Sequence, residues 1–169
     1  MAPLLGSERG TTLIETTVAS GILLVVMAGL LGMAGLATSY TENHGHLEAR
    51  TAEYAQDKME QLLAIAYTDH GTNTIAFPAT PTGGSGLAVG GSVTTTAPVA
   101  GYVDWLAYDG SLLGGGATAP AGWFYERVWQ ISQLTPSIKQ ISVTATVKSS
   151  VGKAMVPKSS VVALKTSQF

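Results

Sequence analysis

The chain has 169 residues, of which 46% are hydrophobic, 12% are charged and 7% are aromatic. Soluble domains carry about 25% charged residues, so this is not the composition of an ordinary cytosolic domain, and its apolar content excludes a disordered chain. The formal net charge of −2 offers no basic footprint for nucleic acid, and the absence of cysteine excludes disulfides and thiolate zinc sites.

An uncharged segment of membrane length lies near the N-terminus. No residue between Glu15 and Glu42 carries a charge, and the core of this run, 18–37, reads VASGILLVVMAGLLGMAGLA. A hydrocarbon core of about 30 Å needs about 20 apolar helical residues, so we predict a transmembrane segment over 16–41. The alternative is a cleaved secretory signal, because Ala37-Thr38-Ser39 fits a small-x-small cleavage site.

The residues just before this segment form a recognisable motif. The run Glu8-Arg9-Gly10-Thr11-Thr12-Leu13-Ile14-Glu15 resembles the processing site of type IV prepilins and type II secretion pseudopilins. In that family a short polar leader ends in glycine, and T/S-L-I-E then precedes an apolar helix. The resemblance implies cleavage by prepilin peptidase after Gly10, with 1–10 as the leader. Thr11 would then be the first residue, and because the family commonly has Phe there, N-methylation of Thr11 stays open.

Glu15 acquires a role from the same resemblance. In the family this glutamate pairs with the new terminal amine of a neighbouring subunit, which implies that Glu15 sets the register of assembly. A buried amine and a buried carboxylate are each costly alone, and pairing offsets that cost. The alternative is an acid near a helix N-terminus, where the helix dipole favours it.

A single long helix is predicted over 11–67, because no proline interrupts this range. Within the membrane segment, Gly29, Gly32 and Gly35 serve either close packing between helices or a hinge. Beyond it, apolar residues recur at helical spacing among charged ones, which predicts an amphipathic continuation. The apolar stripe consists of Ala52, Ala55, Met59, Leu62, Leu63 and Ala66.

The C-terminal part of the sequence predicts a small β-sheet. Residues 68–100 are rich in Gly, Thr, Pro and Ala and are expected to form a variable loop, with a short strand at 92–97. The head, 101–169, carries strand patterns, and its last three strands on short connections predict an antiparallel meander. The apolar stripe of the helix would cover this sheet, giving a two-layer α+β fold. The strand patterns lie at 102–108, 123–134, 139–148 and 156–165.

The resemblance implies the same architecture, a long N-terminal helix packed on a small antiparallel sheet. Its nearest groups are the PilV-like minor pilins and the I-type minor pseudopilins of type II secretion. A missing disulfide and only three acidic residues after residue 70 favour a minor over a major subunit. These acids are Asp104, Asp109 and Glu126.

Neither a catalytic nor a metal-binding pattern emerges from the residues. Asp104, Asp109, Glu126 and Arg127 are scattered over predicted strands and turns, and no Ser/His/Asp order or phosphate loop occurs. His44 and His46 are two residues apart and would point to different faces of a helix. We therefore expect no enzymatic activity, no cofactor and no metal.

The function implied by the resemblance is a structural minor subunit of a type IV pilus or a type II secretion pseudopilus. It would sit in the bacterial inner membrane with its N-terminus in the cytoplasm and its head in the periplasm or outside. The implied partners are prepilin peptidase, other pilin or pseudopilin subunits, the inner-membrane assembly platform and membrane lipid, with no nucleic acid. The alternative is a membrane-anchored or signal-peptide-secreted module that binds a ligand through its loop.

Overall fold

The computed structural model describes residues 12–71, 85–148 and 156–167. Internal contacts divide the chain between Glu42 and Asn43 into two compact units. The first unit is helical, and the second combines a helix with a sheet. The elements in chain order are α1 (Leu13–Ala64), β1 (Gly90–Gly91), β2 (Val103–Leu106), β3 (Leu112–Gly114), β4 (Tyr125–Thr135), β5 (Ile138–Val147) and β6 (Lys158–Thr166).

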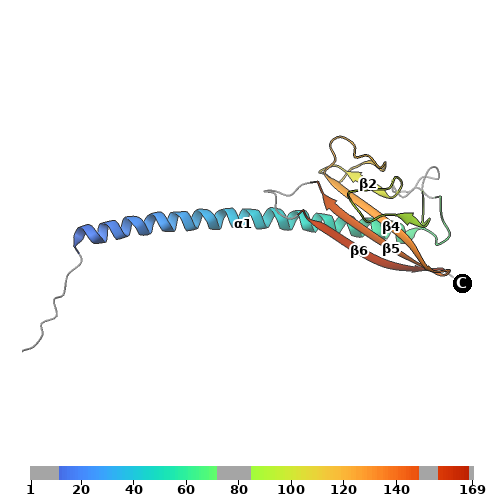
Figure 1. Cartoon of the computed structure of the whole chain (residues 1–169), viewed down its shortest axis with the longest axis horizontal. Coiled ribbons are helices and arrows are strands. Elements are labelled where there is room, and N and C mark those ends of the chain that lie inside the picture. The colour runs from blue at the N-terminus through green and yellow to red at the C-terminus, as the bar shows by residue number, and fades with distance from the viewer. Residues whose placement is uncertain (1–11, 72–84, 149–155, 168–169) are drawn as a thin grey trace, which may run out of the picture. The chain divides into compact units, whose positions relative to one another are not determined.

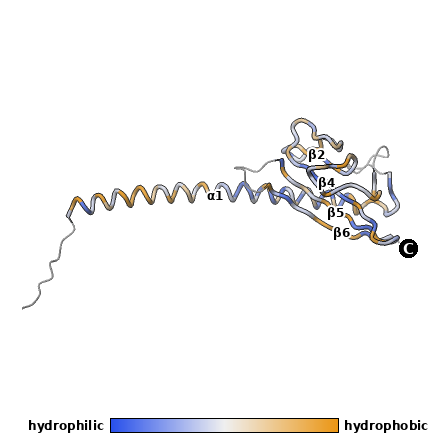
Figure 2. The backbone as a smooth tube through the Cα atoms, viewed as in Figure 1, coloured by the Kyte–Doolittle hydropathy of each residue, from blue (hydrophilic) through white to orange (hydrophobic). Residues whose placement is uncertain are grey.

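Helix α1 contains 52 residues and belongs to both units. In its N-terminal part the apolar side chains are exposed all round, from Leu13 at 86% to Val26 and Met27 at 52%. Figure 2 shows this part as mainly hydrophobic and the following part as more hydrophilic. The change in pattern reflects two environments, because a helix that is apolar on every side is suited to lipid or to a core made of other helices.

The second unit is built on an antiparallel sheet (Figure 1). Its strands follow the order β3-β2-β4-β5-β6, and β1 forms a short pairing with β4. The three long strands β4, β5 and β6 make the predicted meander, with registers such as Trp129 to Val143 and Val143 to Val161. The α+β fold class predicted from the sequence is confirmed.

One face of the sheet packs against α1. The helix buries Thr51, Ala55, Lys58, Met59 and Leu62. Opposite them lie alternate side chains of the central strands β4 and β5. The sheet side of this core consists of Trp129, Ile131, Ile141, Val143 and Ala145.

The buried face of the helix is rotated from the predicted stripe. Leu63 is 40% exposed and Ala66 is exposed, whereas Lys58, a charged residue, is fully buried. The predicted stripe contains only apolar residues. It therefore leaves out Lys58, whose charge is neutralised by Asp104 of the sheet. The helix itself ends at Ala64, three residues before the predicted limit.

The strand predicted at 92–97 is wrong. Ser92 Oγ accepts a hydrogen bond from the Thr94 backbone N–H, and the Ala97 N–H donates to the Thr94 carbonyl, so turns occupy this range. The strand β1 lies just before it, at Gly90–Gly91. Gly91 has a φ of +79°, and a Cβ there would lie 2.3 Å from the Trp129 carbonyl oxygen, so only glycine fits this close approach.

Candidate functional site

The start of helix α1 shows how Glu15 is placed. Thr12 precedes the first helical residue, and its carbonyl accepts hydrogen bonds from the Glu15 N–H at 2.9 Å and the Thr16 N–H at 3.2 Å. Thr12-Leu13-Ile14-Glu15 also has the T-x-x-E spacing of a capping box. Glu15 is exposed in the first turn, where the helix dipole favours an acid. Gly10 and Thr11 lie outside the described residues.

The apolar part of α1 is an uncovered surface. It is long and apolar enough to cross a membrane, and none of it is buried inside the protein. This is the property of a membrane anchor or a signal sequence. The Ala37-Thr38-Ser39 run lies within this helix, where the Thr38 hydroxyl donates to the Ala34 carbonyl at 3.0 Å.

The three glycines of the span lie in unbroken helix. Gly29, Gly32 and Gly35 are three residues apart and gather toward one side of α1. A Cβ added at any of them would meet nothing within 4 Å. Contacts within the chain therefore do not require glycine at these positions, and the choice between packing and hinge stays a prediction.

A buried cluster of charges joins the helix to the sheet. Lys58 Nζ and Arg127 Nε each lie 2.7 Å from the Oδ2 atom of Asp104, and both Lys58 and Asp104 have fully buried side chains. Arg127 Nη1 also reaches Asp57 Oδ2 at 2.6 Å, and Asp57 accepts a hydrogen bond from Gln61. The cluster was not predicted from the sequence, because Lys58, Asp104 and Arg127 lie far apart along the chain, on α1, β2 and β4.

Burial and pairing act in opposite directions on these charges. Loss of hydration lowers the pKa of Lys58 to about 8, although the neighbouring Asp104 opposes that shift. Burial also raises the pKa of Asp104, against the pull of Lys58 and Arg127. The Lys58 ammonium lies 4.4 Å from the centre of the Trp129 ring, so an aromatic face supplies part of its environment. The cluster therefore neutralises its own charges inside the core.

Glu126 occupies the opposite face of the sheet from Arg127, as the alternation of a strand predicts. It is 3% exposed, and its Oε1 atom has no hydrogen-bond partner among the described residues. Burial raises the pKa of Glu126 to about 7. This side of the sheet also carries a small apolar cluster of Val103, Trp105 and Val128, with Ala119 and Trp123 packed on it.

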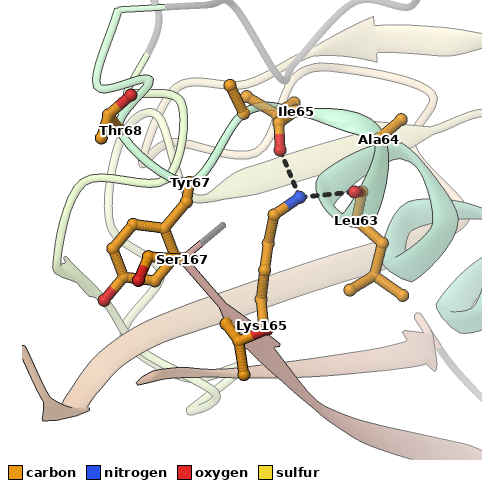
Figure 3. Close-up of a pocket in the computed structure, with 9 residues that line it drawn as sticks. Leu63, Ala64, Ile65, Tyr67, Thr68, Lys165 and Ser167 are labelled. Carbon is orange, nitrogen blue, oxygen red and sulfur yellow. Dashed lines mark hydrogen bonds between the residues drawn. The ribbon is translucent and has the colours of Figure 1, made fainter. Parts of the chain in front are cut away.

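Two lysines hold the C-terminal end of α1. The Lys165 ammonium donates to the carbonyls of Leu63 and Ile65 (Figure 3). Lys139, its register partner on β5, donates to the carbonyls of Tyr67 and Leu87, both at 2.8 Å. Cations at this end satisfy carbonyls that the helix leaves unpaired, and they favour its dipole. A small pocket lies beside this contact and is lined by Tyr67, Lys165 and Ser167, among others (Figure 3).

His44 and His46 lie in different surroundings. His44 Nδ1 lies 3.3 Å from Glu48 Oε1, one helical turn further on, whereas His46 is exposed. Among the residues that the structure describes, no group of three or more His, Cys, Asp or Glu residues is arranged to hold a metal ion.

These features together define a pilin-like architecture: a long N-terminal helix, apolar over its first part, which packs over its last part on an antiparallel sheet. Searches among protein-family models, curated proteins and solved structures give no match to this chain. The relationship to prepilins therefore depends on the motif before the helix and on the architecture.

Proposed function

We propose that this protein is a subunit of a type IV pilus or a type II secretion pseudopilus, of the minor kind. Prepilin peptidase would cleave it after Gly10, and the helix would then pass from the inner membrane into the core of a filament. The observation that carries the proposal is the Thr12–Glu15 motif placed directly before an apolar helix surface that no other described residue covers.

The apolar surface of the N-terminal part of α1 needs a cover. In water such a surface would aggregate, so it has to be covered by lipid or by other apolar helices. A filament whose subunits pack these helices together covers it without lipid. In that core the new amine of Thr11 and the carboxylate of Glu15 would each need an opposite charge. Pairing between neighbouring subunits supplies it.

The proposal assigns the protein a structural task. Its partners are prepilin peptidase, other pilin or pseudopilin subunits, the inner-membrane assembly platform and membrane lipid. It invokes no catalytic group, cofactor, metal or nucleic acid. Before assembly the N-terminus would lie in the cytoplasm, and the second unit, Asn43–Phe169, would lie beyond the inner membrane.

Processing of the leader tests the proposal. Gly10→Val should block cleavage and leave a precursor heavier by about 1 kDa, since ten residues weigh roughly 0.1 kDa each. Gly6→Val changes the same residue type in the same leader and should be processed normally. Mass spectrometry of the mature protein should find Thr11 first. A mature protein that starts at Met1, or just after Ala37-Thr38-Ser39, would show an anchored or secreted binding module instead.

A further inference from the structure

Charges of opposite sign are segregated in the second unit. From Arg127 to the C-terminus every charged residue is a lysine or arginine. From Glu42 to Glu60, by contrast, the helix carries five acids against Arg50 and Lys58. Lys58 is fully buried, Arg50 is paired with Glu53 and Arg127 with Asp57, so the acids of this part of α1 that have no lysine or arginine partner among the described residues are Glu42, Glu48 and Glu60. A basic sheet and an acidic helix within one unit could attract each other between copies.

Among the lysines of the described strands, Lys158 is the one that remains available, whereas the Lys148 ammonium, just after β5, lies 5.1 Å from the centre of the Trp123 ring. Lys165 donates to the Leu63 carbonyl at the end of α1, Lys139 donates to the carbonyls of Tyr67 and Leu87, and Arg127 is held by the buried cluster. Lys158 is exposed at the start of β6 and forms no ion pair with any described residue. It is therefore placed to meet an acid from outside the chain.

The strand that bears Lys158 also presents uncovered apolar side chains. Strand β6 ends the sheet, so its outer edge pairs with no described strand. Val161 and Ala163 pack into the core, whereas Val162 and Leu164 alternate with them and are each 60% exposed. Lys158 lies on the same face as Val162, because the two are four residues apart on a strand. This face, with Lys158, Val162 and Leu164, is called the β6 face below.

The complementary surface is the side of α1 that turns away from the sheet. Two small residues, Ala49 and Ala52, leave a shallow hollow there, which is bordered by Glu53, Gln56 and Glu60. Glu60 is exposed and, within the described part of the chain, has no ion-pair partner. This surface, with its hollow and its acids, is called the acidic helix face.

The spacing of the two surfaces matches. Lys158 and Val162 are separated by about 13 Å along a strand, at 3.3 Å per residue. Glu60 and Ala52 are separated by about 12 Å along a helix, at 1.5 Å per residue. When Lys158 meets Glu60, Val162 therefore comes to the hollow beside Ala52. Charge and apolar contact are satisfied in the same alignment.

We propose that the β6 face of one copy of this chain binds the acidic helix face of a second copy. The two surfaces are different parts of the same unit, so the contact is heterologous, and each copy keeps one surface open for the next. Such a contact repeats without closing unless its rotation forms a ring. The inference deepens the proposed filament function and rests on it. Two copies of a subunit of low abundance form this contact wherever they are neighbours.

Cross-linking of the full chain, overproduced in membranes of its host so that copies of this minor subunit become neighbours, tests the contact, because the sequence contains no cysteine of its own. A variant that carries both Gln56→Cys and Val162→Cys should give a ladder of dimers, trimers and longer products with a short bis-maleimide. Either cysteine alone should give none. The pair Gln56→Cys and Ser137→Cys, with Ser137 exposed between β4 and β5, is the matched control and should give no ladder.

Charge variants in the double-cysteine chain separate the contact from unspecific proximity. Lys158→Glu should reduce the ladder at least about tenfold, because like charges then face each other. Glu60→Lys should do the same, and the two together should restore it. No ladder, or a ladder that neither charge variant weakens, overturns the contact. The N-terminal residue is read from the same samples: Thr11 without a ladder rejects only this contact, whereas any other start rejects the proposed function.

Discussion

Lys58 of helix α1 and Asp104 of strand β2 are both fully buried, with Nζ and Oδ2 2.7 Å apart. Arg127 of β4 holds the same carboxylate oxygen, also at 2.7 Å. Three elements are thus joined at one atom. Asp104 Oδ1, by contrast, has no partner among the described residues, so the arrangement is balanced in charge but incomplete in hydrogen bonds.

Removal of Lys58 should destabilise the second unit strongly. Lys58→Met leaves the buried Asp104 with Arg127 alone, and loss of one partner of a buried pair costs about 3–5 kcal/mol. Urea unfolding of the detergent-solubilised chain, followed by tryptophan fluorescence, measures the change, since Trp129 lies beside Lys58. Lys158→Met removes an exposed lysine and should change the free energy of unfolding by less than about 0.5 kcal/mol. Equal stability of the two variants would contradict a structural role for the cluster.

Glu126 should make stability fall as the pH rises. Its pKa is about 7 in the folded protein and near 4.5 when it is unperturbed, so between these values the folded state binds more protons than the unfolded state. Stability is therefore lost between about pH 4.5 and pH 7, and the full penalty applies above pH 7. Glu126→Gln, which stays neutral, should gain about 2–3 kcal/mol over the unaltered chain at pH 8 and almost nothing at pH 4.

Chemical unfolding at a series of pH values measures this difference. The comparison between variant and unaltered chain cancels the titration of other groups, including Asp104 and Lys58. Gln56→Ala, a change of a non-titratable residue at an exposed position, is the control and should show no such pH dependence. A Glu126→Gln gain that is the same at pH 4 and pH 8 would exclude ionisation as its cause.

The lysines at the end of α1 should protect its last turn. Lys139→Met removes donors from the Tyr67 and Leu87 carbonyls, and Lys165→Met removes them from Leu63 and Ile65. Hydrogen bonds to a charged group contribute about 1.5–3 kcal/mol, so each change should destabilise by roughly that amount. Hydrogen exchange by mass spectrometry should show faster exchange in the peptides around 60–68. Faster exchange throughout the sheet would instead indicate global unfolding.

Glu15 allows its two proposed roles to be separated. Glutamine is also accepted at the third position of a capping box, so Glu15→Gln should preserve the start of the helix while it removes the charge. Cleavage should proceed normally, and incorporation into filaments, measured by immunoblot of the sheared fraction, should fall at least about tenfold if the charge sets assembly. Thr12→Ala removes instead the hydroxyl that the T-x-x-E spacing offers for capping and leaves the charge. Normal incorporation of the Glu15→Gln protein would reject the assembly role.

The main elements could be predicted because local patterns determine them. The uncharged run before Glu42 and the alternation of β5 are visible in single windows of sequence, and both predictions of secondary structure are confirmed. The strand β1 could not be predicted in this way. Two glycines form it only because Trp129 and Tyr102 approach the backbone closely, and that contact is made by residues distant in the sequence.

The buried charges were missed for a related reason. Lysine is a residue type expected at the surface. Lys58 can be buried because α1, β2 and β4 come together in the fold and place Asp104, which Arg127 also contacts, beside it. The opposite faces of Glu126 and Arg127, in contrast, follow from their adjacency on one strand. Periodicity thus predicts which side of the strand or helix a residue faces. The charged residues that it contacts on that side depend on the complete fold.

The buried cluster has a mechanical consequence for the second unit. Sliding of the sheet along α1 by one helical turn, about 5.4 Å, would separate Lys58 from Asp104 and Asp57 from Arg127 at once. A half-turn shift does not avoid that cost, because it already takes the buried Lys58 ammonium away from its counterion and leaves Asp104 with Arg127 alone. Under a pulling force the sheet should keep its position on α1 until the ion pairs break, and the two should then separate in one abrupt step.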